Sequence, residues 1–368
     1  PPRTLWHYTP SAMERARCGF VGLKNLGATC YMNALVQQLY MIPEFRGGII
    51  ELPLPDEPPQ PPKEKGTPNK ALLAQLQIMY AFLHESEKKF FDTRDLCAAW
   101  RDSDALPINP SVQMDVDEFY NQLIEQLEGA LKDTPAAKLL SSLFGGTLVN
   151  QIVSKDGRML SDRNEIFYTL SIDVKCKKSV LDGLASYVEG EVLDGDNKYK
   201  CESGEYVEAV KRTCVGKLPP VLFIHLKRFE FDFEAMRKVK LDDHFEFPFT
   251  INMRPYTAEG IAAAAASQAA AADAAVTGSS DNGGGVGAEV DGAGVPSGAA
   301  ARASTASAAG VGAHDSAAGI SATDHAAALA AGQLYELVGV LVHSGTADSG
   351  HYYSYIKERR TASVGSGG

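Results

Sequence analysis

The sequence predicts an α+β fold in which a mostly helical first half precedes a second half built mainly of strands. Apolar residues recur at helical spacing over 72–83 and 112–127, and residues 31–40 form a shorter helical stretch. From about residue 143 the pattern changes to strand-length runs rich in β-branched and aromatic residues. These runs are 147–153, 165–174, 221–229, 334–343 and 351–356.

Two segments interrupt this order. Residues 52–68 hold seven prolines, which break helices and strand ladders alike and predict a surface linker. Residues 258–332 are mainly Ala, Gly and Ser with no aromatic residue, and this composition predicts a disordered insertion. Its Ala runs favour transient helical turns, but the interspersed Gly and Ser argue against a stable element.

Composition narrows the class of protein. The net charge is −11, and residues 258–332, with seven acids against one arginine, account for six of those charges. The sequence lacks the clustered Lys/Arg surface of a nucleic-acid-binding protein, and no apolar run reaches the roughly 18 residues of a membrane span. Six scattered cysteines indicate reduced thiols rather than a disulfide framework. We therefore expect a soluble intracellular protein that binds neither nucleic acid nor membrane, located in the cytoplasm, with the nucleus left open.

Cys30 is the candidate nucleophile. A cysteine attacks a carbonyl as the thiolate, which a helix N-terminus or a neighbouring imidazolium stabilises. Small residues at 27–29 lead into the helix predicted at 31–40, so the thiol would lie at the positive end of the helix dipole. Asn25, five positions upstream, can offer a side-chain amide to an oxyanion. A small buried cysteine that merely begins a core helix fits the local sequence equally well.

Two histidines near the other end of the chain are candidates for the base. His351 follows a glycine and begins a predicted strand, a rim position that suits a general base. His343 lies eight residues earlier, and spacing alone does not rank the two. For either one alone, a hydrogen-bonded structural role is the commoner one.

Four blocks in order along the chain share a family resemblance. Residues 20–42 contain the run Asn-Leu-Gly-Ala-Thr-Cys-Tyr-Met-Asn, and 113–119 read Gln-Met-Asp-Val-Asp-Glu-Phe. Residues 218–229 end in His-Leu-Lys-Arg-Phe, and 335–356 contain His-Ser-Gly and Gly-His-Tyr. These blocks resemble the ubiquitin-specific proteases, papain-like cysteine deubiquitinases, over roughly 18–356 without the Ala-rich insertion. The amino-acid sequence of residues 226–256 is most similar to that of the very large fat-facets-type members.

The resemblance implies a fold and catalytic roles. The fold would be papain-like, with a helical thumb, a β-rich palm and β fingers, and ubiquitin's C-terminal tail would lie between thumb and palm. Cys30 would attack the carbonyl of the tail's terminal glycine, Asn25 would stabilise the oxyanion, and His351 would be the base. His343 matches a non-catalytic histidine that lines the cleft.

The resemblance also implies a site for the basic ubiquitin tail. Asp115 and Glu118, three positions apart on one face of the second amphipathic helix, match acids that bind this tail. From the residues alone, a pair of solvated acids near a helix N-terminus is the preferred interpretation, because the helix dipole favours acids there.

The sequence departs from the family in the fingers. Many members carry two CxxC pairs that close a tetrahedral zinc site. The first pair should fall near 151–156, which has no cysteine, and the second near 199–204, where only Cys201 remains. We expect no metal and no cofactor, with the fingers held by strand pairing.

A second departure concerns the residue that orients the base. The resemblance divides the chain into an N-terminal flank, 1–17, and a catalytic domain, 18–368. In the family an Asp or Asn follows the histidine and orients its imidazole, but residues 352–368 contain neither. We expect this third residue to lie beyond 368, the domain to be incomplete at its C-terminus, and the chain to be a weak enzyme.

The predicted function is that of a thiol-dependent deubiquitinase. It would hydrolyse the peptide or isopeptide bond after the C-terminal glycine of ubiquitin, with ubiquitin and ubiquitinated proteins as partners. Two alternatives stay open: a ubiquitin-binding module whose catalysis is lost, and a protease for a ubiquitin-like modifier. The presence of Cys30, Asn25 and His351 together favours the enzyme, because a decayed site would be free to lose them.

Overall fold

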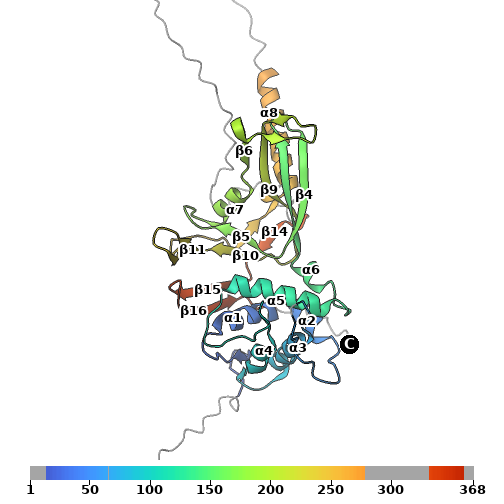
Figure 1. The fold of residues 1–368 in the computed structure, drawn as a ribbon, viewed down its shortest axis with the longest axis vertical. Helices are drawn as coiled ribbons and strands as arrows, with labels where there is room; N and C mark the ends of the chain where they lie inside the picture. The colour runs from blue at the N-terminus through green and yellow to red at the C-terminus, as the bar shows by residue number, and fades with distance from the viewer. Residues whose placement is uncertain (1–13, 65, 278–330, 360–368) are drawn as a thin grey trace, which may run out of the picture.

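Figure 1 shows most helices gathered at one end of the molecule and most strands at the other. The computed structural model describes residues 14–64, 66–277 and 331–359. Its α-helices are α1 (Cys30–Tyr40), α2 (Pro43–Ile50), α3 (Lys70–Glu85), α4 (Arg94–Ala99), α5 (Val116–Leu131), α6 (Leu139–Leu143), α7 (Val180–Val188) and α8 (Ala258–Thr277). Short 3₁₀ turns are η2 (Gly195–Asn197) and η3 (Arg254–Tyr256).

The strands lie mainly in the second half of the chain. They are β1 (Gly22–Leu23), β2 (Phe90–Phe91), β3 (Gly146–Ser154), β4 (Met159–Phe167), β5 (Leu170–Asp173), β6 (Glu191–Leu193), β7 (Tyr199–Lys200), β8 (Tyr206–Val207), β9 (Ala209–Lys217), β10 (Ile224–Lys227), β11 (Phe229–Asp232), β12 (Arg237–Lys240), β13 (Thr250–Asn252), β14 (Leu334–Glu336), β15 (Gly339–Gly345) and β16 (Gly350–Ile356).

Helices α1 to α6 form what we call the helical lobe. Its centre is α1, whose apolar residues pack on all sides; Met32 and Leu39, for example, are fully buried. The hairpin β15–β16 belongs to this lobe although it comes from the far end of the chain (Figure 1). Gln38 of α1 donates a hydrogen bond from Nε2 to the carbonyl of Tyr355 at 2.9 Å. The end of the chain is thus fastened along the helix that starts at Cys30.

Strands β3 to β14, with α7 and α8, form what we call the strand lobe. A four-stranded sheet in the order β4-β3-β9-β6 is antiparallel throughout. Beside it, β5 and β10 pair in parallel, with Leu170 opposite Ile224, and α7 packs against β5. Leu170, Ile172 and Leu184 are fully buried there and form the second core of the molecule.

Several predicted elements have other boundaries in the structure. The predicted helix 112–127 begins at Val116 because Asp115 caps it, so Val112 lies exposed in the preceding loop. The predicted strand 165–174 is two strands, β4 and β5, which pair with different neighbours, β3 and β10. The predicted strand 334–343 is likewise divided into β14 and β15.

The predicted disordered insertion, 258–332, needs a correction at its start. Residues 258–277 form α8, because alanine has the highest helix propensity and the first turn is anchored. The hydroxyl of Thr257 accepts from the amide of Gly260 at 3.0 Å, and Ile261 packs against the core of the strand lobe. Residues 278–330 lie outside the described part of the chain.

Most described residues of the predicted linker are exposed, and the described end of the predicted flank, residues 14–17, is partly or fully exposed. Residues 52–64 and 66–68 contain neither helix nor strand. In the predicted flank, residues 1–13 lie outside the described chain, but Glu14 already bridges to Lys88 next to the helical lobe. Among the described residues, no helix is both long and apolar enough to cross a membrane.

Candidate active site

Cys30 is the first residue of α1 and is 5% exposed. Thr29 precedes it as the N-cap residue, and its side chain is fully buried. The first amides of a helix have no partner within the helix, and the helix dipole places partial positive charge beside them. A negative charge on the sulfur or on a bound oxyanion is therefore stabilised at this position.

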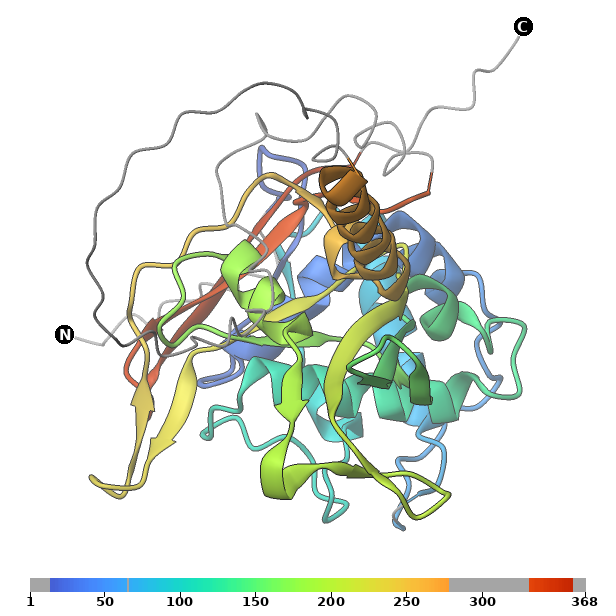
Figure 2. The same ribbon diagram turned by 90° about the horizontal axis from the view of Figure 1, so that it is seen from above.

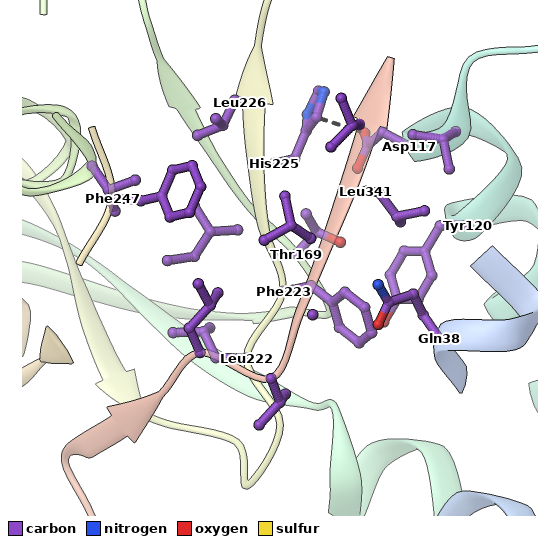
Figure 3. Close-up of a pocket in the computed structure, with 18 of the residues that line it drawn as sticks. Gln38, Asp117, Tyr120, Thr169, Leu222, Phe223, His225, Leu226, Phe247 and Leu341 are labelled. Carbon is purple, nitrogen blue, oxygen red and sulfur yellow. Dashed lines mark ion pairs between the residues drawn. The ribbon is translucent and has the colours of Figure 1, made fainter. Parts of the chain in front are cut away.

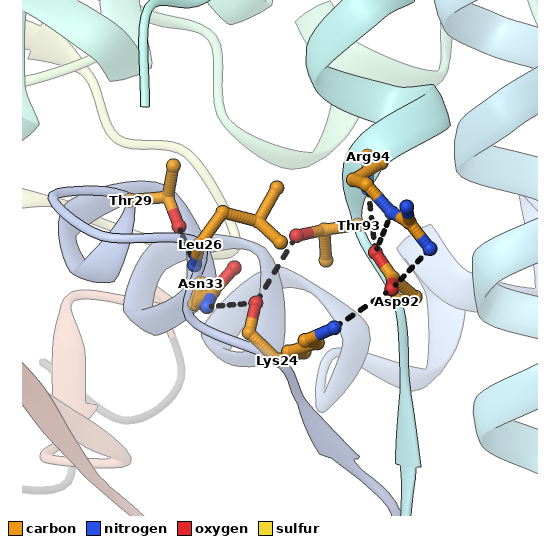
Figure 4. A network of polar contacts seen from close by, with 7 residues as sticks. All are labelled: Lys24, Leu26, Thr29, Asn33, Asp92, Thr93 and Arg94. Atoms are coloured by element: carbon orange, nitrogen blue, oxygen red, sulfur yellow. Dashed lines mark hydrogen bonds and ion pairs between the residues drawn. The ribbon is translucent and has the colours of Figure 1, made fainter. Parts of the chain in front are cut away.

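The segment before Cys30 is tied down by a network of hydrogen bonds (Figure 4). The carbonyl of Lys24 accepts from Asn33 Nδ2 on α1 and from Thr93 Oγ1, each at 3.2 Å. The Lys24 ammonium forms an ion pair with Asp92 at 3.1 Å. The approach to the thiol is thus held between α1 and the start of α4.

Asn25 is oriented by its acceptor oxygen. Its Oδ1 accepts from the amide of Gly27 at 3.1 Å, from the amide of Thr29 at 3.2 Å and from the hydroxyl of Thr29 at 3.1 Å. Because all three groups are donors, the amide atom that they face must be the oxygen, and Nδ2 lies at the other position. The Nδ2 group has no protein partner among the described residues and is left to donate outward, as the predicted oxyanion role requires.

Strand β16 runs beside the thiol. The amide of Tyr352 donates to Cys30 Sγ at 3.4 Å, and the hydroxyl of Tyr352 lies 3.4 Å from Asp115 Oδ2. Burial, followed by the charge of Asp115, raises the pKa of Tyr352, so the hydroxyl stays protonated and donates to that carboxylate. His351 immediately precedes Tyr352, and its backbone is therefore adjacent to the sulfur across 321 positions of sequence.

The His351 ring itself is exposed and does not contact the thiol by a hydrogen bond. It lies over Tyr353, with ring centroids 6.5 Å apart and an interplanar angle of 22°. Within the described chain, no hydrogen bond joins this ring to Cys30 Sγ or to a carboxylate. Catalytic hydrogen bonds are often unformed before substrate binds, so this geometry by itself does not exclude His351 as a base.

His343 is packed into the wall of the cleft between the two lobes. It lies opposite Tyr352 in the hairpin, and its ring contacts Tyr352 and Phe229 at centroid distances of 4.6 and 5.2 Å. Burial, followed by the nearby Lys240, lowers the pKa of His343 below its ordinary value. His343 thus lies in the cleft wall, and its role toward a bound tail stays a prediction.

Asp115 and Glu118 lie at the start of α5 but do not share a helix face, because Asp115 is the N-cap. Its Oδ1 accepts from the amides of Asp117 at 2.8 Å and Glu118 at 3.3 Å. Glu118 is exposed and accepts from Gln122 Nε2 at 3.2 Å. Asp115 lines the cleft with its second oxygen directed to Tyr352, so capping and cleft lining are combined in one carboxylate.

The cleft between the lobes has a volume of about 970 Å³ and is lined mainly by apolar side chains (Figure 3). An ion pair between two of its lining residues spans it: His225 Nδ1 on β10 lies 3.5 Å from Asp117 Oδ2 on α5. The same nitrogen is 3.2 Å from Ser171 Oγ. Burial raises the pKa of Asp117 above its usual value, although His225 opposes this shift. Sequence reasoning gave neither residue a role, although both lie within the blocks that showed the family resemblance.

Comparison with known proteins matches residues 21–363 to the family model described as ubiquitin carboxyl-terminal hydrolase. The chain belongs to the ubiquitin carboxyl-terminal hydrolase family. Its relatives in this family include hydrolase 9X of Mus musculus, 32% identical over 97% of this chain, and the Drosophila melanogaster hydrolase puf, 36% identical over 97%. The chain spans only 14% and 8% of these two relatives, so the predicted likeness to very large members is confirmed.

A solved structure supports the fold of this hydrolase-family chain. The SAGA Ubp8/Sgf11/Sus1/Sgf73 DUB module bound to ubiquitin aldehyde matches with a TM-score of 0.59 at 24% identity. The match covers 94% of this chain and 63% of that one. The predicted α+β, papain-like fold is confirmed.

In this member of the ubiquitin carboxyl-terminal hydrolase family, strand pairing and ion pairs connect the segments at and next to 151–156 and 199–204, where the resemblance would place zinc ligands. The amide of Lys155 donates to the carbonyl of Glu208 at 3.2 Å. The Glu208 carboxylate forms ion pairs with Lys155 at 3.0 Å and Lys198 at 3.5 Å. Within the described residues, no group of three or more His, Cys, Asp or Glu side chains is arranged to hold a metal.

Proposed function

We propose that this chain is a thiol-dependent deubiquitinase that hydrolyses the bond after the C-terminal glycine of ubiquitin. The observation that supports this most directly is the hydrogen bond from Tyr352 N to Cys30 Sγ at 3.4 Å. It places Tyr352, the residue after His351, in contact with Cys30, the first residue of α1. The first and last of the four blocks therefore meet at this point. Family membership over residues 21–363 supports the same activity.

The proposed first half-reaction forms a thioester. His351 takes the proton of the Cys30 thiol, and the thiolate attacks the carbonyl carbon of the terminal glycine. The carbonyl electron pair moves onto oxygen, where Asn25 Nδ2 and the amides at the start of α1 donate to it. The intermediate collapses, the carbon–nitrogen bond breaks, and His351 returns the proton to the departing amine, a lysine side chain or an α-amino group.

The second half-reaction releases ubiquitin. His351 removes a proton from water, the resulting hydroxide adds to the thioester carbonyl, and the same donors stabilise the oxyanion. The carbon–sulfur bond then breaks, and the sulfur leaves as thiolate or takes the proton from His351. Asp115 and Asp117, which line the cleft, and Glu118 beside them in the first turn of α5 would present negative charge to a basic tail.

Ubiquitin with an electrophilic C-terminus tests the proposal. We expect wild-type protein to form a covalent adduct with a mass increase of one ubiquitin, and Cys30→Ala to form none. Binding without an adduct by the wild type would contradict the enzyme and support a ubiquitin-binding module. Reaction only with a ubiquitin-like modifier would contradict the proposed substrate. Cys97→Ala, which removes another buried thiol of the same lobe, is the control.

A further inference from the structure

The base of the β11–β12 hairpin is fastened to β15 by two side chains. Phe229 and Lys240 lie opposite each other where this hairpin begins and ends. The Phe229 ring packs edge-on against His343, at a centroid distance of 5.2 Å and an angle of 74°. Figures 1 and 2 both show the hairpin beside the free end of β15–β16. Two strands of the strand lobe thus touch the hairpin that contains His351.

Lys240 makes the polar half of this contact. Its ammonium donates to the carbonyls of His343 at 3.2 Å and Gly345 at 3.1 Å, and it forms an ion pair with Asp242 at 3.0 Å. The side chain is 11% exposed, so few water molecules could replace these partners. Hydrogen bonds from a charged donor are shorter and stronger than neutral ones. The ammonium therefore holds two carbonyls of one strand at a defined distance from β12.

The residue between those two carbonyls is the register partner of the proposed base. Ser344 lies between His343 and Gly345 and is paired with His351 across the hairpin. The end of this hairpin is also tightly packed, since a Cβ on Gly350 would lie 2.3 Å from His343 Nε2 and 2.4 Å from Ser344 O. A shift of the β15 carbonyls is therefore passed to His351 rather than absorbed locally.

We propose that Lys240 is a positioning residue for His351. It clamps the end of β15, and through the Ser344–His351 pair it sets where the imidazole can meet the Cys30 thiol. This inference rests on the proposed function, because it assumes that His351 is the base. It extends that function by placing part of the catalytic geometry in the strand lobe, 111 positions before the histidine.

Kinetics of three variants test the proposal. Lys240→Met removes the charge and the hydrogen-bond donors but keeps much of the length of the side chain. Lys240→Arg keeps both the charge and the donors. The matched control is Lys238→Met, which removes a charge from an exposed residue two positions earlier on the same strand. Misplacement of a catalytic group by about 1 Å can lower a rate by about a hundredfold. With a ubiquitin–fluorophore amide as substrate, we expect Lys240→Met to lower kcat at least tenfold while KM stays within twofold of wild type. Lys240→Arg should recover most of kcat. The control Lys238→Met should match wild type in both constants.

A second measurement separates positioning from a general loss of structure. The rate at which iodoacetamide alkylates Cys30, measured against pH, reports how well the imidazole supports the thiolate without requiring ubiquitin. We expect the Lys240→Met profile to move to higher pH, toward that of His351→Ala, while thermal unfolding stays cooperative. If Lys240→Met fails to fold, Lys240→Gln takes its place, since it keeps a neutral donor.

Each outcome has a distinct meaning. An unchanged kcat and alkylation profile in a folded Lys240 variant would overturn the positioning role while leaving the deubiquitinase proposal intact. A change in KM alone would also overturn it, because Lys240 would then act on substrate binding. Failure of the wild type to form the ubiquitin adduct would remove the proposed function, and the alkylation profile would still show whether Lys240 positions His351 next to Cys30.

Discussion

Thr29 connects the helix that begins at Cys30 with the orientation of Asn25. Its hydroxyl accepts from the amide of Leu26 at 3.0 Å and donates to Asn25 Oδ1 at 3.1 Å. The side chain is fully buried, so water does not replace either bond when it is removed. The Thr29 hydroxyl is thus one of three donors that hold the Asn25 amide oxygen, beside the backbone amides of Gly27 and Thr29.

Thr29→Val keeps the shape of this side chain and removes the hydroxyl. We expect the free energy of unfolding to fall by about 1 kcal/mol, because a buried amide loses its partner. We expect kcat to fall by less than about tenfold, well short of the hundredfold or more for loss of an oxyanion donor, because the amides of Gly27 and Thr29 still hold the Asn25 oxygen and only the hydroxyl is lost. Steady-state hydrolysis of a ubiquitin–fluorophore amide measures this. Thr29→Ser, which keeps the hydroxyl, should be near wild type; equal losses in both variants would contradict the argument.

At the scale of elements, α8 shows how anchoring decides whether an Ala-rich segment becomes a stable helix. Propensity alone leaves such a segment marginal. Here Thr257 and the 3₁₀ turn η3 contact the first turn of α8. A Cβ on Gly260 would lie only 1.9 Å from the carbonyl oxygen of Arg254. The glycine is therefore the point at which the helix approaches the strand lobe.

Gly260→Val tests this anchoring. The added side chain overlaps the Arg254 carbonyl, and overpacking of this kind lowers the free energy of unfolding by about 1–3 kcal/mol. We expect a lower melting temperature and reduced far-ultraviolet helical ellipticity. Ala262→Val, an exposed change two residues later on the same helix, should have little effect on either quantity. An equal loss in both variants would mean that β-branching, rather than the close approach, is responsible.

Periodicity and composition predicted most elements but not all of their pairings. The stretches around α1, α3 and α5 have strong 3.6-residue patterns, and the helices lie where these patterns are. The break at 168–169 between β4 and β5 is not marked by Gly or Pro, so 165–174 reads as one strand-like run, and the two strands are divided by their different partners, β3 and β10. The position of β15–β16 against α1 could not be predicted from local patterns, since it joins residues more than 300 positions apart.

The residues around the candidate site also differ in how far the sequence could predict them. Cys30, Asn25 and His351 follow from motifs, and the structure places their backbones together. Asp117 and His225 lie in the other two blocks, 113–119 and 218–229, but their contact depends on how the two lobes face each other. Lys240 lies in none of the four blocks, and a lysine near the end of a strand is normally solvated, so its contacts with β15 became visible only in the structure, where its side chain is 11% exposed.

At the scale of the whole molecule, the Asp117–His225 pair links the two lobes across the cleft. The two side chains are only 20% and 26% exposed, so the carboxylate is partly removed from water. Burial raises the pKa of Asp117, which means that the folded state disfavours its charged form. Retaining this charge therefore lowers the stability of the fold, which is consistent with a role in binding.

Asp117→Asn should make the protein more stable at neutral pH. Below the ordinary pKa of 3.8 the carboxyl is protonated in both folded and unfolded states, and the variant gains nothing. As pH rises through that value, the unfolded state ionises first and the wild type loses stability, while the variant does not. We expect the melting temperature of the variant to exceed that of wild type at pH 7 and to equal it near pH 3. A lower melting temperature at pH 7 would show that the ion pair outweighs the desolvation.

The pairing of β13 with β14 has a consequence for engineering. Asn252 lies opposite Leu334, and the amide of Met253 donates to the carbonyl of Gln333 at 2.8 Å. The chain therefore leaves and re-enters the fold at neighbouring points, and α8 leads it away from α1 (Figure 1). The entropy of closing a flexible loop grows so slowly that doubling its length costs only about 0.6 kcal/mol. A reporter domain whose own termini are close together could be spliced in after α8, at a distance from Cys30.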